Sequence, residues 1–440
     1  MAPQHRQARD AARAPLALLA IVAAVAVANT YYVQPLLHLL AVRFRLHGGS
    51  AGLLVTVTQA GYVLGLATLL PFGDRWDRRR LIIVTLVAAA LFDGLVALAS
   101  GLVLEVVGLL GAGIFSAAAQ LAVTYVATAA EPARRGRAVA TVMGGLLAGI
   151  VLARTYAGGL AQLAGVAAVF WVAALGCVLL AAVVWWRLPA ECAPKERSLA
   201  QLYRSTLHFI RSEPLLQLRA LLGFVSFAAF SMFWTTMALA LSSAPYRLSA
   251  GAIGLFGFAG LAGVLAARMV GHQADRGRSG LTTVVSFGLI ALSWLGLVVD
   301  RSSLVAFVVL TATLDAGIQG AQLSNQSSIY LLAPGSQGRI TMVYMVIYFL
   351  GGVVGSSGAS WLYGFDGFHG VALAGIWVGV VGLALMVGFG RREKAWRATA
   401  RRLGTSRAPR ASLSSAQEGA ACAPGAACSS LEEPRGWEAG

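Results

Sequence analysis

The stretches Gly61-Tyr62-Val63-Leu64-Gly65 and Pro71-Phe72-Gly73-Asp74-Arg75 close one apolar run near the start of the chain. A second apolar run closes on Gly271-His272-Gln273-Ala274-Asp275-Arg276, with Asp275 standing 201 residues after Asp74. Five later residues recur with a shift of 202: Gln120, Pro132, Gly136, Arg137 and Met143 return as Gln322, Pro334, Gly338, Arg339 and Met345. A membrane chain made of two similar halves usually holds its binding site between them.

The composition is that of a membrane protein, because 58% of the residues are hydrophobic and only 12% are charged. Apolar segments of about 20 residues, long enough to cross a bilayer, recur along the chain. Only helices satisfy their own backbone in lipid when the spans are joined by short loops. We therefore predict an all-α integral membrane protein with twelve transmembrane helices in two pseudo-symmetric six-helix bundles. The expected spans are 16–38, 51–72, 81–100, 102–128, 138–160, 163–186, 214–241, 249–271, 280–299, 303–330, 339–362 and 368–390.

The spans divide the chain into five parts. We predict a cytoplasmic N-terminal tail (1–13), an N-terminal six-helix bundle (14–188), a cytoplasmic linker (189–212), a C-terminal six-helix bundle (213–390) and a disordered cytoplasmic tail (391–440). The linker is too short to hold a core of its own. The tail is rich in Arg, Ala, Ser, Gly and Pro and shows no apolar periodicity.

The net charge of +16 does not indicate a nucleic-acid partner, because the basic residues gather in alternate loops. This positive-inside pattern places both termini in the cytoplasm. We expect the protein to lie in the inner (plasma) membrane of the cell. The basic loops hold Arg6, Arg9, Arg13, Arg75, Arg78, Arg79, Arg80, Arg134, Arg135, Arg137, Arg187, Lys195, Arg197, Arg204, Arg211, Arg276, Arg278 and Arg339, and the other loops hold Arg43, Arg45, Arg247 and Arg301.

Motifs for enzymatic chemistry are absent from the sequence. It has no Gly-x-x-x-x-Gly-Lys-Ser/Thr phosphate loop, and none of its His and Cys residues have zinc-site spacing. We expect a monomer that is not an enzyme and needs no cofactor or metal, with a small solute, the lipid bilayer and H⁺ as its partners.

The segment 61–80 resembles the signature loop between helices two and three of the major facilitator superfamily. The matching residues are Gly61, Gly65, Pro71, Asp74, Arg75, Arg78, Arg79 and Arg80. The resemblance implies a gate at the cytoplasmic face, where Asp74 faces the positive N-terminal end of a helix in the other half. Asp275 and Arg276 are the second copy, for which a gate and a mere topology signal stay equally open. Gly61 and Gly65 are expected to allow close helix approach.

A narrower resemblance links the chain to a bacterial efflux-type subgroup of that superfamily. The stretch Asn29-Thr30-Tyr31-Tyr32-Val33-Gln34-Pro35 and the stretch Leu314-Asp315-Ala316-Gly317-Ile318-Gln319 carry it. The resemblance implies a mechanism class and no substrate. The chain departs from drug–proton antiporters in the fifth span, where Arg154-Thr155 stands in place of their Gly-Pro pair. A multidrug assignment is therefore in doubt.

Asp315 is the leading candidate for proton coupling. It lies about 17 Å into the tenth span at 1.5 Å per residue, close to the middle of the bilayer. Asp315, Gln319, Gln322 and Gln326 follow the i, i+4, i+7, i+11 spacing of one helical face. A carboxyl group at this depth needs a cavity, a partner or a proton. The alternative is a structural hydrogen bond to another helix.

Arg154 lies in the outer third of the fifth span, where a permanent cation must snorkel, pair with an acid or bind an anion. Its candidate partners are Asp93, Glu105 and the substrate. For Asp93, a structural hydrogen bond to another helix stays an equally open alternative to a functional role. Glu105 begins the fourth span, where a solvated carboxylate needs no further explanation.

The helices that should face the central cavity carry a set of polar and aromatic residues. Such residues can hold an organic ligand, although they also bridge helices in ordinary packing. The expected cavity residues are Asn29, Tyr32, Gln34, Gln120, Arg154, Trp234, Thr235, Asp315, Gln319, Gln322, Tyr344 and Tyr348.

These observations predict a secondary active transporter that moves a small organic solute by alternating access, with proton-coupled export (antiport) as the first reading. Two alternatives stay open. One is proton-coupled uptake of a small solute, because the sequence does not encode direction. The other is a membrane sensor that kept the fold without transport.

Overall fold

The computed structural model describes residues 16–73, 75–130, 134–189, 204, 210–260, 279–300, 302–330, 332 and 337–406. Within these ranges the chain is helical and contains no strand. This confirms the all-helical fold class that the composition predicts.

The helices before residue 188 form the first half of the molecule. The first span, Leu16–Arg43, is interrupted by a turn at residues 29–32 and continues as α2. The expected fourth span is likewise made of two pieces, α5 and α6. The bounds are α2 (Val33–Arg43), η1 (Gly48–Gly52), α3 (Leu53–Phe72), α4 (Arg78–Ala97), α5 (Leu102–Phe115), α6 (Ala118–Ala129), α7 (Arg135–Ala164) and α8 (Val166–Arg187).

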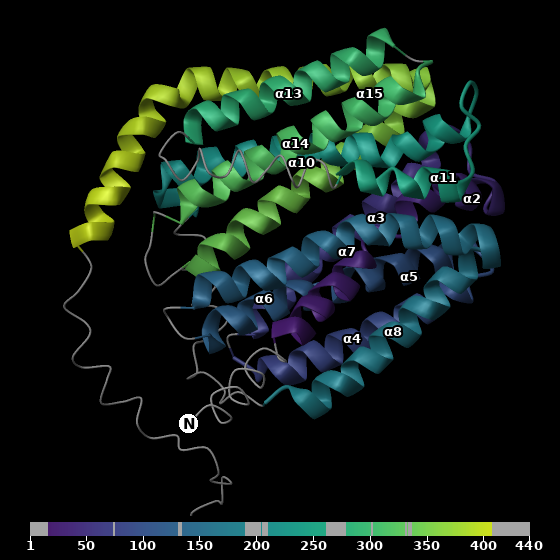
Figure 1. Cartoon of the computed structure of the whole chain (residues 1–440), viewed down its shortest axis with the longest axis horizontal. Helices are drawn as coiled ribbons and strands as arrows, with labels where there is room; N and C mark the ends of the chain where they lie inside the picture. The colour runs from purple at the N-terminus through teal and green to yellow at the C-terminus, as the bar shows by residue number, and fades with distance from the viewer. Residues whose placement is uncertain are drawn as a thin grey trace, which may run out of the picture.

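The helices after residue 213 form the second half. Their bounds are α10 (Pro214–Ser242), α11 (Ala250–Leu255), α13 (Ser279–Val299), α14 (Leu304–Ile329) and α15 (Gln337–Ser406). The long α15 is two helices joined at Asp366 and Gly367, whose backbone is not helical. Figure 1 shows α3 to α8 grouped on one side of the molecule and α10, α13, α14 and α15 grouped on the other.

Ten helices of the described ranges are long and apolar enough to cross a membrane. The last of them, Ile340–Glu393, contains the break at Asp366 and covers two of the expected spans. The helix Ala250–Gly260 is the described part of the expected eighth span, 249–271. The described helices therefore overlap the expected spans, and the count of twelve stays a prediction.

Local signals set the helix ends. The side chains of Asp77, Ser249 and Ser303 accept hydrogen bonds from the backbone N–H groups of the first turns of α4, α11 and α14. Such caps satisfy donors that the helix itself leaves unpaired. Gly165, with φ +84°, makes the tight turn from α7 to α8, a backbone conformation that glycine adopts without strain.

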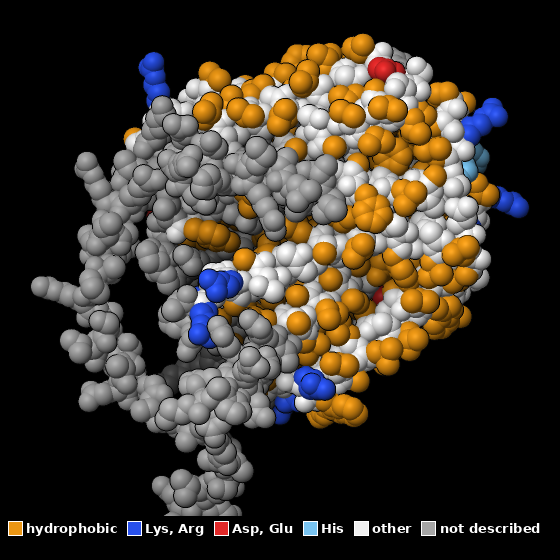
Figure 2. Space-filling view, in the orientation of Figure 1, with side chains coloured by type: hydrophobic (Ala, Val, Ile, Leu, Met, Phe, Trp, Pro, Cys, Tyr) orange, Lys and Arg blue, Asp and Glu red, His pale blue; other side chains and the backbone are white. Residues whose placement is uncertain are grey.

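Two ends of the bundle are named here by their turns. The Gly165 end carries the turns after Arg43, Leu98, Gly165 and Ser243, and the Gly73 end carries the turns after Phe72 and Ala130. Figure 2 shows apolar side chains over the middle of the molecule and Lys and Arg side chains toward its two ends. Leu91, Trp186 and Trp377 are among the large apolar side chains that are exposed on the surface of the protein. That surface suits lipid rather than water.

Glycines allow α3 and α5 to touch, as expected for Gly61 and Gly65. A methyl group added at Gly61 would overlap the carbonyl oxygen of Leu110, and one at Gly65 would overlap that of Ile114. Backbones approach this closely only where a residue has no side chain.

The last helix runs past the predicted end of the second bundle at residue 390 and continues to Ser406. The reason is visible at Glu393, whose buried side chain pairs with the buried Arg219 of α10. The predicted N-terminal tail, residues 407–440 and most of the predicted linker lie outside the described residues.

Candidate functional site

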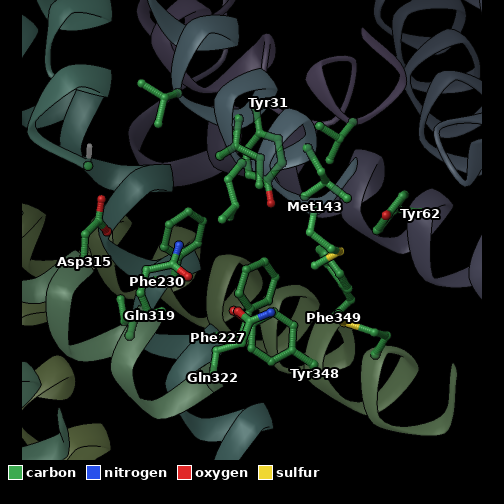
Figure 3. Close-up of a pocket in the computed structure, with 18 of the residues that line it drawn as sticks. Tyr31, Tyr62, Met143, Phe227, Phe230, Asp315, Gln319, Gln322, Tyr348 and Phe349 are labelled. Atoms are coloured by element: carbon green, nitrogen blue, oxygen red, sulfur yellow. The ribbon is translucent and has the colours of Figure 1, made fainter. Parts of the chain in front are cut away.

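A cavity lies between the two halves, and both halves line it. The first half contributes Val27 and Tyr31 of the first span, Tyr62 of α3, Gln120 of α6 and one side of α7. The second half contributes residues of α10, α14 and α15, together with Gly260. In Figure 3, Asp315 stands on one side of this space and Tyr62 on the other, with the Tyr31 hydroxyl pointing between them.

Asp315 is buried in the cavity wall on α14, with 4% of its surface exposed. Its Oδ1 accepts a hydrogen bond from Nε1 of Trp234 on α10, at 3.2 Å. Gln319 and Gln322 line the cavity on the same face of α14, and the hydroxyl of Tyr348 donates to Oε1 of Gln322. The predicted polar face therefore borders the cavity as far as Gln322, whereas Gln326 is not one of its lining residues.

Arg154 lines the cavity from the first half, on α7, and is 2% exposed. Its Nε donates to Oε1 of Gln34 at 2.8 Å. Its Cζ lies 3.6 Å from the centre of the Trp234 ring, and the rings of Tyr31 and Phe230 lie 5.2 and 5.4 Å away. This aromatic contact stabilises a cation that water cannot reach. Arg154 does not snorkel to the membrane surface, which removes one of the predicted alternatives.

Six of the twelve expected cavity residues line the cavity, and two more stand directly behind it. Gln34 and Trp234 do not line the cavity, but both contact Arg154. The lining residues among the expected set are Gln120, Arg154, Asp315, Gln319, Gln322 and Tyr348.

Asn29 and Tyr32 differ from the prediction, because they face the interior of the first half. Nδ2 of Asn29 donates to Oδ2 of Asp93 at 3.1 Å and lies 3.8 Å from Sγ of Cys177. Tyr32 packs on Tyr156, with ring centres 5.3 Å apart. Val27 and Tyr31, one helical turn apart, line the cavity, whereas Asn29 and Tyr32 lie on another face of the first span. Asp93 thus forms a helix–helix hydrogen bond, which was one of the two roles predicted for it.

Tyr344 and Thr235 also lie away from the cavity. The hydroxyl of Tyr344 accepts a 3.5 Å hydrogen bond from Asn325 inside the second half. Thr235 is buried near the Gly165 end, where a methyl group added at Gly52 would lie 2.8 Å from its Cγ2. Glu105 was expected to be solvated, and this is wrong: the residue is fully buried.

The remaining lining residues were missed because they are apolar or aromatic, and a search for polar side chains passes over them. The Phe227–Phe230 spacing on α10, i and i+3, marks one helical face and was a usable signal. The missed residues are Val27, Tyr31, Tyr62, Met143, Leu146, Leu147, Ile150, Val151, Phe227, Phe230, Gly260, Ile318, Met345 and Phe349.

The predicted gate lies only partly within the described residues. Arg75 is exposed at the Gly73 end. Arg79 donates to the backbone oxygen of Trp185, and its Cζ lies 5.2 Å from the centre of the Trp185 ring. Asp74, Asp275 and Arg276 lie outside the described residues, so the gate stays a prediction.

The two halves touch near the Gly165 end. Gln59 of α3 donates to Ser231 of α10 at 3.1 Å. Thr155 of α7 donates to the carbonyl oxygen of Gly254 on α11 at 3.0 Å. A methyl group added at Gly158 would overlap the carbonyl oxygen of Ala250, whereas one at Gly159 would meet nothing within 4 Å. The α7–α11 contact therefore depends on glycines on both helices, because a methyl group added at Gly254 would also lie 2.7 Å from the carbonyl oxygen of Arg154.

Two pseudo-symmetric helical halves with a charged cavity between them are the architecture of a large transporter family. The sequence profile of the Major Facilitator Superfamily matches residues 19–356. The chain belongs to the Major Facilitator Superfamily. This confirms the predicted family, and the chain is a multi-pass membrane transporter of that superfamily.

Relatives of this superfamily member carry transporter names. It is 43% identical over 386 residues to a protein of Escherichia coli O157:H7 named "Uncharacterized transporter YgaY", covering 86% of this chain and 97% of the relative. It is 33% identical over 374 residues to "Probable transporter SCO4007" of Streptomyces coelicolor, covering 84% of this chain and 86% of the relative.

Solved structures of the superfamily share the fold at low sequence identity. A bacterial homologue of the human lysosomal transporter Spinster, in an inward-facing and unoccupied conformation, matches with a TM-score of 0.63 at 12% identity. The match covers 90% of this chain and 98% of that one. An occupied, inward-facing structure of such a homologue gives the same TM-score at 13% identity, covering 89% of this chain and 94% of the other.

Proposed function

We propose that this superfamily member is a proton-coupled secondary transporter that exports a small organic solute by alternating access. The observation that carries the proposal is the cavity between the halves, with a buried acid from one half and a buried cation from the other. Rocking of the halves about such a cavity would expose it to each side of the membrane in turn.

The orientation follows from the charged residues. Arg75, Arg79, Arg134 and Arg211 gather at the Gly73 end, which we assign to the cytoplasm of a cell with an inner (plasma) membrane. The Gly165 end is then external, and its inter-half hydrogen bonds support a closed external side. The transporter acts as a monomer, since each chain has its own cavity.

Orientation can be tested by thiol labelling in intact cells. In a background with all four cysteines replaced by serine, Arg247→Cys places a thiol in an exposed turn at the Gly165 end, and Arg211→Cys places one at the Gly73 end. A membrane-impermeant maleimide should label Arg247→Cys in intact cells and Arg211→Cys only after lysis. The reverse pattern would overturn the assigned orientation.

Asp315 is the proposed proton carrier. A buried carboxyl group in a membrane cavity can alternate between a charged and a neutral form, and each form binds a charged solute differently. Asp300 provides a matched acid outside the spans, because the backbone N–H groups of Ser303 and Ser302 hold its pKa below the usual value. Asp300 therefore stays ionised near neutral pH and should not carry a coupled proton.

The test is proton movement driven by solute in proteoliposomes. Sugars, amino acids, organic acids and cationic drugs are added to vesicles that hold wild type, Asp315→Asn or Asp300→Asn. We expect a pH change with wild type and Asp300→Asn, and a loss of at least about 100-fold with Asp315→Asn, as for other essential proton-transfer groups. An unchanged proton signal in Asp315→Asn would remove this residue from coupling. The sign of the pH change distinguishes exchange from uptake together with a proton.

A further inference from the structure

Arg154 and Asp315, the two charged groups of the cavity wall, each have an atom without a hydrogen-bond partner among the described residues. Nε of Arg154 is satisfied by Gln34, whereas Nη2 is buried without a hydrogen-bond partner. For Asp315, Oδ1 accepts from Trp234, and the described residues donate no hydrogen bond to Oδ2. A buried guanidinium N–H without a partner costs free energy, so such a group indicates a missing acceptor.

The two charges do not satisfy one another. No ion pair within 4.0 Å joins Arg154 and Asp315 in the described part of the chain, because Trp234 lies between them. The face of its indole ring contacts the guanidinium group, and its N–H donates to the carboxylate. The cavity therefore presents a cation and an anion separately, one from each half of the molecule.

The cavity that both groups line fits a small molecule. About 60 Å³ of the cavity is open to the centres of water molecules. One water needs about 10–15 Å³ on this measure, so the space holds roughly four to six waters. Sites for drug-sized ligands are about 300–1,000 Å³. The rings of Tyr31, Phe227 and Tyr348 supply apolar contact for the uncharged part of a ligand.

We propose that the cavity binds a small zwitterionic solute of amino-acid type, with its carboxylate on the guanidinium group of Arg154 and its ammonium group on Asp315. This assignment rests on the proposed transport function and names the class of its substrate. A solute with both charges satisfies both groups, whereas a cationic drug would leave Arg154 without its acceptor and place a second cation beside it.

The arrangement also links the solute to the proton. The carboxylate of Asp315 can accept a proton or the ammonium group of the solute, and occupation by one weakens the other. Competition for one group is what an exchanger requires, because each ligand then displaces the other on its own side of the membrane. Arg154 keeps its charge throughout and holds the solute by its carboxylate.

The test is equilibrium binding to the purified full-length protein in detergent at pH 7, by titration calorimetry. The twenty standard L-amino acids are titrated first, followed by matched analogues of the binders that lack one charged group. For leucine, these are 4-methylpentanoate without the ammonium group and isopentylamine without the carboxylate. We expect each analogue to bind about 10- to 150-fold more weakly than the amino acid, the range for one lost charged hydrogen bond.

Two variants should reverse this selectivity in opposite directions. Arg154→Gln should weaken amino-acid binding by about 10- to 150-fold and strengthen isopentylamine binding, because the cation that repels an ammonium group is gone. Asp315→Asn should bind 4-methylpentanoate at least as well as leucine. Arg154→Lys keeps the charge without the planar donor pair, so its affinity for amino acids should lie between those of wild type and Arg154→Gln. Because the two variants are expected to change ligand selectivity in opposite directions, misfolding of one variant could not produce this result.

The inference is overturned if the amine binds wild type as tightly as the amino acid, or if Arg154→Gln binds amino acids unchanged. It is also overturned if no amino acid binds at 10 mM. In that case, proton-coupled flux of another solute would leave the proposed transport function intact, whereas its absence across the panel would remove that function as well.

Discussion

Replacement of Glu393 with alanine is expected to destabilise the second half by about 3–5 kcal/mol, the cost of leaving a buried charge without its partner. Arg219 has no exposed surface, and Glu393 forms its ion pair within the described residues. Arg219 also donates to Thr283 at 2.7 Å and to Asn325 at 3.1 Å. These neutral acceptors orient the guanidinium group but cannot balance its charge.

Thermal unfolding of the purified protein, followed by near-ultraviolet circular dichroism, measures this loss. The double variant Arg219→Leu/Glu393→Leu should recover most of the stability, because two apolar side chains often replace a buried ion pair without cost. Truncation provides an independent check. A chain that ends at residue 390 loses Glu393 and should unfold early, whereas a chain that ends at residue 406 keeps the pair and should match the full-length protein. Equal stability of the two truncations would contradict the prediction.

Replacement of Gly158 with alanine is expected to slow transport at least about tenfold, while the same change at the neighbouring Gly159 has little effect. At Gly158 the added methyl group meets the backbone of Ala250 on α11, and at Gly159 it meets nothing within 4 Å. Overpacking costs about 1–3 kcal/mol. The cost falls only on the conformation in which α7 and α11 touch, so it shifts the conformational equilibrium by about 5- to 150-fold.

Solute flux in proteoliposomes measures the rate. Labelling of a cysteine at Gln319 from the external side measures the conformation, since this residue lines the cavity. Gly158→Ala should increase the labelling and Gly159→Ala should not. The same response in both variants would show that the close contact between α7 and α11 does not limit closure.

The sequence predicts the large features of this molecule because they rest on composition and repetition. The repeat around Asp74 and Asp275 predicts two halves, and apolar length predicts the spans. Asp315 and Arg154 are found because a charge deep in an apolar segment is costly and therefore conspicuous. Their position on the cavity wall was expected on those grounds.

Other features depend on contacts that a linear pattern does not contain. Asn29 and Tyr32 were expected in the cavity because they are polar, but their partners Asp93 and Tyr156 in the first half become visible only in the structure. Glu393 follows an apolar span in a run of charges, and such a run normally lies in water. The position of Arg219, 174 residues earlier in the chain, explains its burial. The aromatic lining was missed because aromatic residues also fill ordinary helix packing.

Trp234 touches the cation of the cavity with its ring face and the anion with its N–H. The emission of an indole shifts with the electric field across its ring, and here that field comes from two groups only a few ångströms away. The protein thus contains a built-in optical probe directly behind the wall of its cavity. With the other tryptophans replaced by phenylalanine, the emission wavelength of Trp234 would report each change of charge in the cavity as it happens.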